Sequence, residues 1–348
     1  MARAPAVVAA AVAVAVAVAA AGGAKRGKLV ETMMNVDRFD GGLRAREWAW
    51  LLLIALAILL IATNGRAQSA YEKTYATPEE AADALVQAVK SHDRRAILAT
   101  LGGASDWITS GDPVADRAAG DRFVAAYEAK HALTGSGDKM TLIVGDDYPF
   151  GFPLVKSGDR WRFDTEAGKE ELLARRIGEN EIDAIKVLEA IVDAQMEYAS
   201  KDRNGDGVLD YAQKFASTSG KHDGLYWPTK AGEPPSPLGV LAAQASGEGY
   251  KKKDSGPTPY HGYYYRMLKG QGKNASGGAL DYVVHGRAIG GFAVVAYPAK
   301  YGSSGIMTFV VNQDGKVFQT DLGPTTAMRA GKMRRYDPGE GWSPVVSR

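Results

Sequence analysis

The stretch EAGKEELLARRIGENEIDAIKVLEAIVDAQMEYASKD (residues 166–202) carries apolar residues at helical spacing. One face of the predicted helix holds Ile182, Ile185, Leu188, Val192 and Met196, with Glu, Asp and Lys side chains elsewhere. An amphipathic helix of this kind most often buries its apolar face within its own chain, and binding a separate partner is the less common use. We therefore expect a long helix that docks on a sheet.

The part of the chain before this helix, residues 71–170, predicts helices followed by a small antiparallel sheet. Thr77 is a favourable N-cap, Pro78 suits the first helical position and Glu80 completes a capping box. A second helix is expected over residues 116–133, and short strands are expected at residues 139–145, 152–158 and 160–165. This order, with the hairpin PLVKSGDRWRFD, resembles the nuclear-transport-factor-two-like cone, a fold that hosts enzymes, binding proteins and inert modules alike.

Residues 171–348 predict a second α+β domain, in which the long helix packs on an antiparallel sheet. A proline-rich loop is expected at residues 230–239, and strands are expected at residues 260–268, 278–286, 290–299, 305–313 and 315–323. The sequence NQDG at residues 312–315 is typical of a hairpin turn. The predicted fold class is therefore α+β, with two α+β domains after an N-terminal segment.

The order of long helix, variable loop and strand meander resembles the globular part of type IV pilin-like and pseudopilin proteins. The sequences that carry this resemblance are GYYYRML (262–268) and GGFAVVAYPAKYGSSGIMTFVVNQDGKVF (290–318). Those families begin with a hydrophobic half-helix that is used for polymerisation, and the corresponding half is absent here. The resemblance therefore implies a pilin-like fold without filament formation.

Residues 1–67 are interpreted as a low-complexity and signal-peptide segment. An Ala/Val-rich run is followed by an uncharged apolar run at residues 48–62, which Arg44 and Arg46 precede. Small residues then supply a signal-peptidase site, so we expect cleavage after Ala67 and export to the periplasm or cell envelope. The alternative is an uncleaved membrane anchor at residues 48–62, although this run is short for a bilayer span of about 20 residues.

The composition limits the chemistry of the chain. Its 348 residues suffice for about two domains. The absence of cysteine excludes disulfides, thiolate metal sites and cysteine nucleophiles. The formal net charge of +2 becomes slightly negative once residues 1–67 are removed, and no basic stripe remains. We therefore expect no nucleic-acid partner.

The stretch DRNGDGVLDYAQ (residues 202–213) has the pattern of an EF-hand-type calcium loop. In such loops positions 1, 3, 5 and 9 offer oxygens directly or through water, position 6 is a turn glycine, position 7 offers a carbonyl and position 12 is a bidentate glutamate. These positions hold, in the same order, Asp202, Asn204, Asp206, Asp210, Gly207, Val208 and Gln213. The loop follows the long helix, and a further helix is expected at residues 210–217.

Gln213 departs from this pattern, because a neutral amide cannot bind an ion as a bidentate carboxylate does. We therefore expect weak Ca²⁺ binding, towards the range of about 10⁻⁴–10⁻³ M that extracellular modules show. A lone weak site of this kind stabilises a fold more often than it transmits a signal. The alternative is a polar Asp/Asn/Gly turn that binds no ion.

The remaining candidates for a catalytic role are the five histidines, His92, His131, His222, His261 and His285. The chain has no H-E-x-x-H pattern, G-x-S-x-G elbow or P-loop. His222 lies beside Asp223 in a stretch that reads as a surface loop rather than a working dyad. His261 and His285 are candidates for a common cleft, and a hydrogen-bonded structural role is the alternative for each.

Across residues 71 to about 340, the chain resembles a bacterial exported family described as domain of unknown function 2950. The motifs that carry the resemblance include ATPEEAADALVQAV (76–89), AQMEYASKDRNGDGVLDYAQKF (194–215), KHDGLYWP (221–228) and PTPYHGYYYRML (257–268). The resemblance implies export and an envelope location, and it supplies no catalytic residue.

The sequence favours a non-catalytic, exported envelope module with a structural calcium site, acting through contacts with an envelope protein or a glycan. One alternative is an envelope hydrolase that uses a first-domain pocket or the His222/His261/His285 region. Another is a carrier of a small apolar ligand. Membrane contact is expected only through the N-terminal segment, if it is not cleaved.

Overall fold

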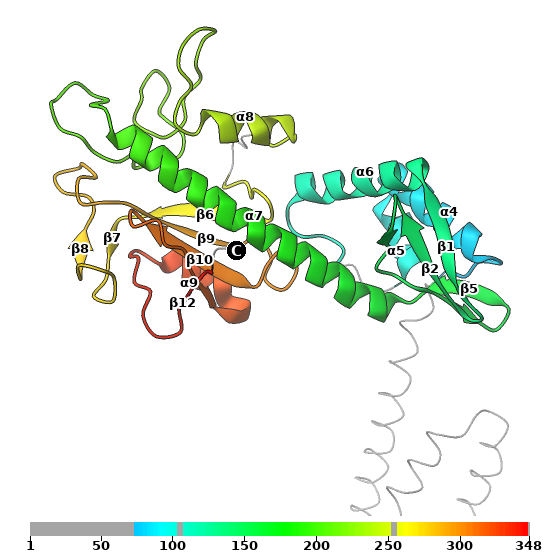
Figure 1. Cartoon of the computed structure of the whole chain (residues 1–348). Coiled ribbons are helices and arrows are strands. Elements are labelled where there is room, and N and C mark those ends of the chain that lie inside the picture. Colours follow the sequence, from blue (N-terminus) through cyan, green and yellow to red (C-terminus); the bar gives the residue numbers. More distant parts are fainter. Residues whose placement is uncertain (1–72, 103–106, 252–255, 347–348) are drawn as a thin grey trace, which may run out of the picture. The chain divides into compact units, whose positions relative to one another are not determined.

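The computed structural model describes residues 73–102, 107–251 and 256–346. The predicted signal segment, its cleavage site and the anchor alternative fall within residues 1–67 and lie outside these ranges. Residues 72–348 group as one compact unit, and its described part is α+β, as predicted (Figure 1). No helix in the described ranges is long and apolar enough to cross a membrane. The division into two domains near residue 170 stays a prediction.

The N-terminal half, residues 73–170, consists of three helices and a small sheet. Its elements are α4 (Pro78–Lys90), α5 (Arg94–Leu101), α6 (Pro113–Ala129), β1 (His131–Ser136), β2 (Lys139–Val144), β3 (Tyr148–Pro149), β4 (Leu154–Ser157) and β5 (Arg160–Phe163). The strand order is β1-β2-β4-β5, with β3 paired to β2, and all these pairs are antiparallel. Leu85 of α4 packs in a core with Phe152, Leu154 and Phe163.

Two predictions about these helices have different outcomes. The N-cap is confirmed, because Thr77 Oγ1 accepts the Glu80 N–H, whereas the Glu80 carboxylate accepts the N–H of Ala76, one residue before the cap, in place of that of Thr77. The helix expected over residues 116–133 is wrong at its C-terminal end. Residues 131–136 pair with β2 along their whole length, and this long-range pairing replaces the last predicted helical turn.

Helix α7 (Thr165–Ala199) is the 35-residue helix expected from the sequence, about 50 Å long at 1.5 Å per residue. Its first turns add Leu172 and Leu173 to the N-terminal core. Its later turns lie against the sheet of the C-terminal half, where Leu188 and Ile191 are buried. One continuous helix therefore belongs to both cores (Figure 1).

The buried face of α7 agrees with the predicted one in part. Leu188 is buried, and Ile185 and Val192 pack against the same core, but Ile182 and Met196 are 57% and 42% exposed. The buried line instead contains Ala184, Val187, Leu188, Ile191, Ala194, Gln195 and Tyr198. Gln195 is tolerated there because its side chain forms two hydrogen bonds with the backbone of Ala212, at 2.8 and 2.9 Å.

The C-terminal half is built on one five-stranded antiparallel sheet. Its elements are α8 (Gly239–Gly247), β6 (Tyr263–Leu268), β7 (Gly270–Gln271), β8 (Leu280–Asp281), β9 (Ala293–Pro298), β10 (Met307–Asn312), β11 (Phe318–Asp321), η2 (Gly323–Thr325), α9 (Thr326–Lys332) and β12 (Ser343–Pro344). The strand order is β12-β11-β10-β9-β6, and β7 pairs with β8 separately. Val294 of β9 packs on the α7 side, and its neighbour Val295 packs on the other side with Ala330 of α9.

Two other predictions in this half are wrong. Residues 210–217 form no helix; they contribute isolated bridges from Tyr211 to Ala288 and from Ala216 to Tyr226, which satisfy their backbone groups at long range. The strand expected over residues 278–286 is reduced to Leu280–Asp281. The NQDG turn is confirmed, because the Gly315 N–H bonds to the Asn312 carbonyl and Gly315 has a φ of +72°.

Asp112 joins the two halves through a fully buried carboxylate. Its Oδ1 accepts the Val114 and Ala115 N–H groups and thereby caps α6. Its Oδ2 accepts the Tyr250 hydroxyl at 2.9 Å and the Gly262 N–H at 3.0 Å. A buried carboxylate is stable only when hydrogen bonds replace its hydration. The charge of Asp112 therefore fixes where the chain around Tyr250 and Gly262 meets the start of α6.

Arg176 of α7 makes a second connection. Its guanidinium donates to the carbonyls of Trp107, at 2.9 Å, and Ile108, at 3.2 Å. Burial lowers the pKa of Arg176 from its ordinary value, and the nearby Asp116 carboxylate opposes this shift. The segment that leads into α6 is thus held from both α7 and Asp112.

Replacing Asp112 should destabilise the protein far more than removing an ordinary helix cap. Asp112→Ala removes a cap and leaves the Tyr250 hydroxyl and Gly262 N–H buried without an acceptor, so the unfolding free energy should fall by about 3–5 kcal/mol. The matched control is Asp93→Ala, which removes the exposed N-cap of α5 and should cost about 1 kcal/mol. Urea unfolding measures both, and equal losses would contradict the anchoring role of Asp112.

Candidate functional site

The loop that follows α7 begins with a carboxylate that organises the backbone around it. Asp202 Oδ1 accepts the N–H groups of Asn204, at 3.2 Å, and Gly205, at 2.7 Å, and its Oδ2 accepts that of Gly207, at 2.7 Å. Gly205 and Gly207 have φ angles of +78° and +85°, which residues with a side chain rarely adopt. The two glycines therefore let the chain curl around Asp202.

Two further turns of the same kind follow. Asn204 Oδ1 accepts the Asp206 N–H at 3.1 Å, and Asp206 Oδ1 accepts the Val208 N–H at 3.0 Å. Each side chain bonds to the backbone two residues ahead, as Asn and Asp commonly do in turns. The sequence-predicted residues Asp202, Asn204 and Asp206 thus lie together in one compact loop.

Arg287, which lies far along the chain, contacts this loop at three oxygens. Its guanidinium bonds to the Asp206 carboxylate, to Asp210 Oδ2 at 3.2 Å and to the Val208 carbonyl at 2.7 Å. Asp206, Val208 and Asp210 are the residues at positions 5, 7 and 9 of the predicted calcium loop. The side chains of Arg287 and Asp210 are only 22% and 17% exposed. The loop therefore gathers oxygens around one cationic group.

These contacts also lower the pKa values of two carboxylates in the loop. The hydrogen bond from Arg287 is the main cause that lowers the pKa of Asp206. The hydrogen bond from the Gly207 N–H is the main cause that lowers the pKa of Asp202. Both carboxylates are therefore held in their charged form, in which they bind a cation best.

Gln213 does not take part in the loop. Its Nε2 donates to the Gly286 carbonyl at 2.7 Å, so the side chain at position 12 bonds to the turn that carries Arg287. No group of three or more His, Asp or Glu side chains in the described residues is arranged to hold a metal ion. A metal in the loop thus needs the Asn204 amide and Val208 carbonyl as well as the carboxylates, and it needs the Arg287 contacts to open.

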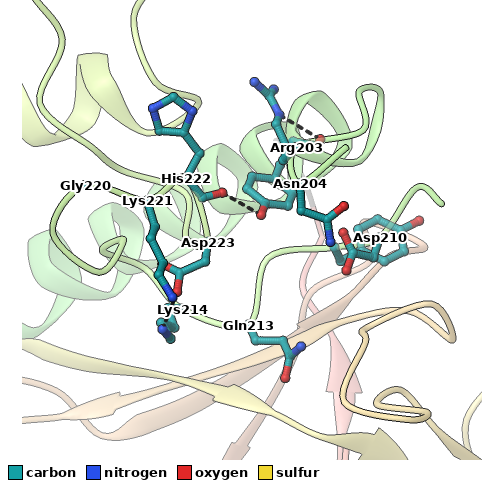
Figure 2. Close-up of a pocket in the computed structure, with 11 residues that line it drawn as sticks. Arg203, Asn204, Asp210, Gln213, Lys214, Gly220, Lys221, His222 and Asp223 are labelled. Carbon is teal, nitrogen blue, oxygen red and sulfur yellow. Dashed lines mark hydrogen bonds and ion pairs between the residues drawn. The ribbon is translucent and has the colours of Figure 1, made fainter. Parts of the chain in front are cut away.

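A pocket of about 530 Å³ lies beside the loop. Figure 2 shows Arg203, Asn204 and Asp210 on one side of it and Lys221, His222 and Asp223 on the other. The Tyr198 hydroxyl, which donates to the His222 carbonyl at 2.8 Å, connects the two sides. The lining mixes tyrosine rings with charged and amide groups, which suits a polar ligand.

Two charged residues of this pocket, Asp223 and Lys214, bond to each other. Asp223 bonds to Lys214 Nζ at 2.7 Å and accepts from both the N–H and the hydroxyl of Thr218. The hydrogen bond from Lys214 is the main cause that lowers the pKa of Asp223 far below its ordinary value. The His222 ring stacks on Trp227, with 4.3 Å between ring centroids, whereas the Asp223 carboxylate bonds to Lys214 and Thr218.

The structure does not bring the candidate histidines together. No hydrogen bond or ion pair joins any two of His222, His261 and His285 in the part of the chain that the structure describes. His285 is exposed in a turn. His261 lies between two carboxylates, with Nδ1 3.6 Å from Asp183 and Nε2 3.4 Å from Glu248, and its φ of +48° is unusual for a side-chain-bearing residue.

The lowered pKa values predict how the loop responds to acid. Because the folded-state pKa of Asp206 lies below its unfolded-state value of about 3.9, the loop's contribution to stability is present above that pH and is lost as the pH falls through the folded-state pKa. The difference in unfolding free energy between the wild type and Asp206→Asn should therefore be constant near neutrality and shrink below about pH 4. Calcium-free urea titrations from neutral to acidic pH measure it, and a difference that persists unchanged in acid would contradict the ion pair.

Residues 72–345 match the family described as protein of unknown function DUF2950. Comparison with curated proteins gave no match, and comparison with solved structures gave none. The matched region covers most of the chain and includes the whole 202–213 loop and Arg287. The family resemblance expected from the motifs is thereby confirmed, and the chain belongs to the DUF2950 family.

Proposed function

We propose that this protein is a non-catalytic module of the cell envelope whose second half is stabilised by calcium in the 202–213 loop. The observation that carries the proposal is the convergence of Asp206, Val208 and Asp210 on a single cationic group. Carboxylate and carbonyl oxygens are the ligands that Ca²⁺ prefers. The export part of the proposal rests on the signal-peptide pattern in residues 1–67, and the pilin-like resemblance of the second half belongs to the same proposal.

The residues present fit calcium by type and by position in the loop. Asp202, Asn204, Asp206, Val208 and Asp210 would hold the ion, and Gln213 would join only after leaving Gly286. One oxygen-rich loop with neutral ligands at positions 3 and 12 suits a weak site. Calcium bound there would neutralise the mutual repulsion of the carboxylates.

The surroundings of the loop support a structural role for the ion. At the start of the loop, Arg203 donates to the carbonyls of Tyr198 and Glu197 at the end of α7. At its end, the Ala212 backbone bonds to Gln195, and Tyr211 bonds to Ala288. The loop thus joins the end of α7 to the region before β9, so an ion there would tighten the contact between helix and sheet.

The pocket of Figure 2 is where we place contacts with an envelope glycan or protein. It combines the partly exposed Tyr211 ring with Arg203 and Lys221, a mixture that can stack on a sugar and bond to its hydroxyls. The asparagine and aspartate of the calcium loop, Asn204 and Asp210, form part of its wall. Binding of calcium and of a ligand in this pocket would therefore share residues.

A second candidate function, an envelope hydrolase, is favoured by one observation. His261 lies between Asp183 and Glu248, and a carboxylate beside an imidazole can orient it as a general base. Hydrolysis of chromogenic ester, phosphate and glycoside substrates by the wild type, with loss in His261→Gln but not in His92→Gln, would support this function in place of the non-catalytic one.

Calcium should raise the thermal stability of the wild type. At about 5 mM Ca²⁺ and a dissociation constant of about 1 mM, the midpoint should rise by about 2–4 °C, and tighter binding should raise it further. Asp206→Asn should lose most of this rise, because it removes a ligand charge. The control, Asp146→Asn, makes the same change at a fully exposed site paired with Lys130 and should keep it. Absence of any calcium-dependent rise in the wild type would refute the site.

The export proposal makes a separate prediction about the native chain. Protein recovered from the envelope fraction should begin at Gln68, because signal peptidase would cleave after Ala67. Intact-mass measurement with N-terminal sequencing checks this. A chain that retains residues 48–62 would instead support the membrane anchor.

A further inference from the structure

The Arg287 guanidinium bonds to oxygens that a metal ion in the 202–213 loop would need. These are oxygens of Asp206, Val208 and Asp210, three of the residues that would ligate calcium. We propose that Arg287 is a built-in competitor of calcium: the arginine holds the loop in the metal-free protein, and calcium displaces it and releases the turn at residues 284–287. This inference rests on the calcium site proposed above.

The competition follows from the shared oxygens. Asp206 Oδ1 accepts the Val208 N–H, and its Oδ2 bonds to both Arg287 and the Asn204 amide. The Val208 carbonyl also points to Arg287, at 2.7 Å. A metal at 2.3–2.6 Å from these oxygens would lie against the guanidinium, and two cations so close repel each other strongly. Arginine and calcium therefore exclude each other.

The turn that carries Arg287 can survive the loss of these contacts. Val284 and Arg287 exchange two backbone hydrogen bonds, at 2.8 and 3.0 Å. The two residues between them, His285 and Gly286, both have positive φ angles, of 49° and 80°, as a tight hairpin turn of type I′ requires. The turn is thus internally closed, and the Arg287 side chain can leave without unfolding it.

Displacement would change how the turn is held. Beyond Arg287, the turn region is tied to the loop by Gln213, which donates to the Gly286 carbonyl, and by the backbone bond from Tyr211 to Ala288. Gln213 is also the residue at position 12, so recruitment of its oxygen by calcium would remove one of these two ties. Calcium binding would therefore make residues 284–287 more mobile.

The chain offers a matched control for the charge of Arg287. Arg203 lies within the loop and carries the same charge, but it donates to the carbonyls of Tyr198 and Glu197 and lies over the Tyr198 and Trp227 rings. Removing Arg203 changes the net charge near the site and removes no bond to the oxygens of Asp206, Val208 and Asp210. Any difference between the two variants therefore isolates the direct competition.

The test is calorimetric titration of the purified chain with CaCl₂. Arg287→Gln should bind Ca²⁺ about tenfold more tightly than the wild type, since couplings between sites commonly lie in the range of 5–150-fold, whereas Arg203→Gln should change the affinity by about twofold or less. Arg287→Lys should fall between the wild type and Arg287→Gln, because a lysine offers a point charge in place of the planar fork. Hydrogen exchange at the Val284 and Arg287 N–H groups should be faster in calcium-saturated wild type, because the turn keeps its own two bonds but opens more often once its side-chain ties to the loop are lost.

The outcomes separate this inference from the calcium site itself. Wild type that binds calcium, with Arg287→Gln no tighter or with Arg203→Gln equally tighter, would overturn the competition and leave the site standing. No binding by any variant would refute the site. Binding by Arg287→Gln alone would support the competition between arginine and calcium, and it would refute calcium binding by the wild type. If Arg287→Gln fails to fold, the Arg287→Lys titration and the exchange measurement on wild type decide the question.

Discussion

The buried carboxylate of Asp112 is the interaction on which the arrangement of this protein depends. A charge without solvent access must be surrounded by donors, and here the donors come from the start of α6, from Tyr250 and from Gly262. Gly262 has a φ of +73°, and a side chain there would collide with Asn180 of α7. The same contact therefore fixes where β6 begins, how closely α7 approaches it and how the N-terminal half is joined to both.

The position of the 202–213 loop depends on this arrangement. Helix α7 ends at the loop, and Gln195 near that end bonds to the Ala212 backbone just beyond it. The 284–287 turn, which precedes β9, is tied to the loop by the Tyr211–Ala288 bond and brings Arg287 to the loop's oxygens. A local turn motif thus becomes a contact between two distant segments of the chain.

Much of the fold could be predicted from local sequence, because the signals are local. The N-cap at Thr77, the NQDG turn and most strands depend on residues a few positions apart. The errors arose where distant contacts decide the outcome. Residues 210–217 have helix-forming residues, yet their backbone groups bond to Ala288 and Tyr226 instead. The burial of the polar Gln195 was not predicted, because the backbone of Ala212 that it bonds to follows the helix and does not enter a helical pattern.

In the candidate site, too, local contacts could be predicted from the sequence and distant ones could not. The loop pattern predicted that Asp202, Asn204 and Asp206 lie together, since the three residues occupy alternate positions of one short loop. Arg287 could not be found in this way, because nothing in its own neighbourhood marks it as the partner of residues some eighty positions earlier. Arg287 shows that two carboxylates of the loop already have a cationic partner within the chain.

The most direct measurement is a crystal structure of the chain at saturating calcium, with anomalous diffraction data collected to locate the ion. The account predicts an anomalous peak coordinated by Asp202, Asn204, Asp206 and the Val208 carbonyl, with the Arg287 side chain turned away from the loop. Arg287 still bonded to Asp206 and Asp210, with no peak in the loop, would contradict it.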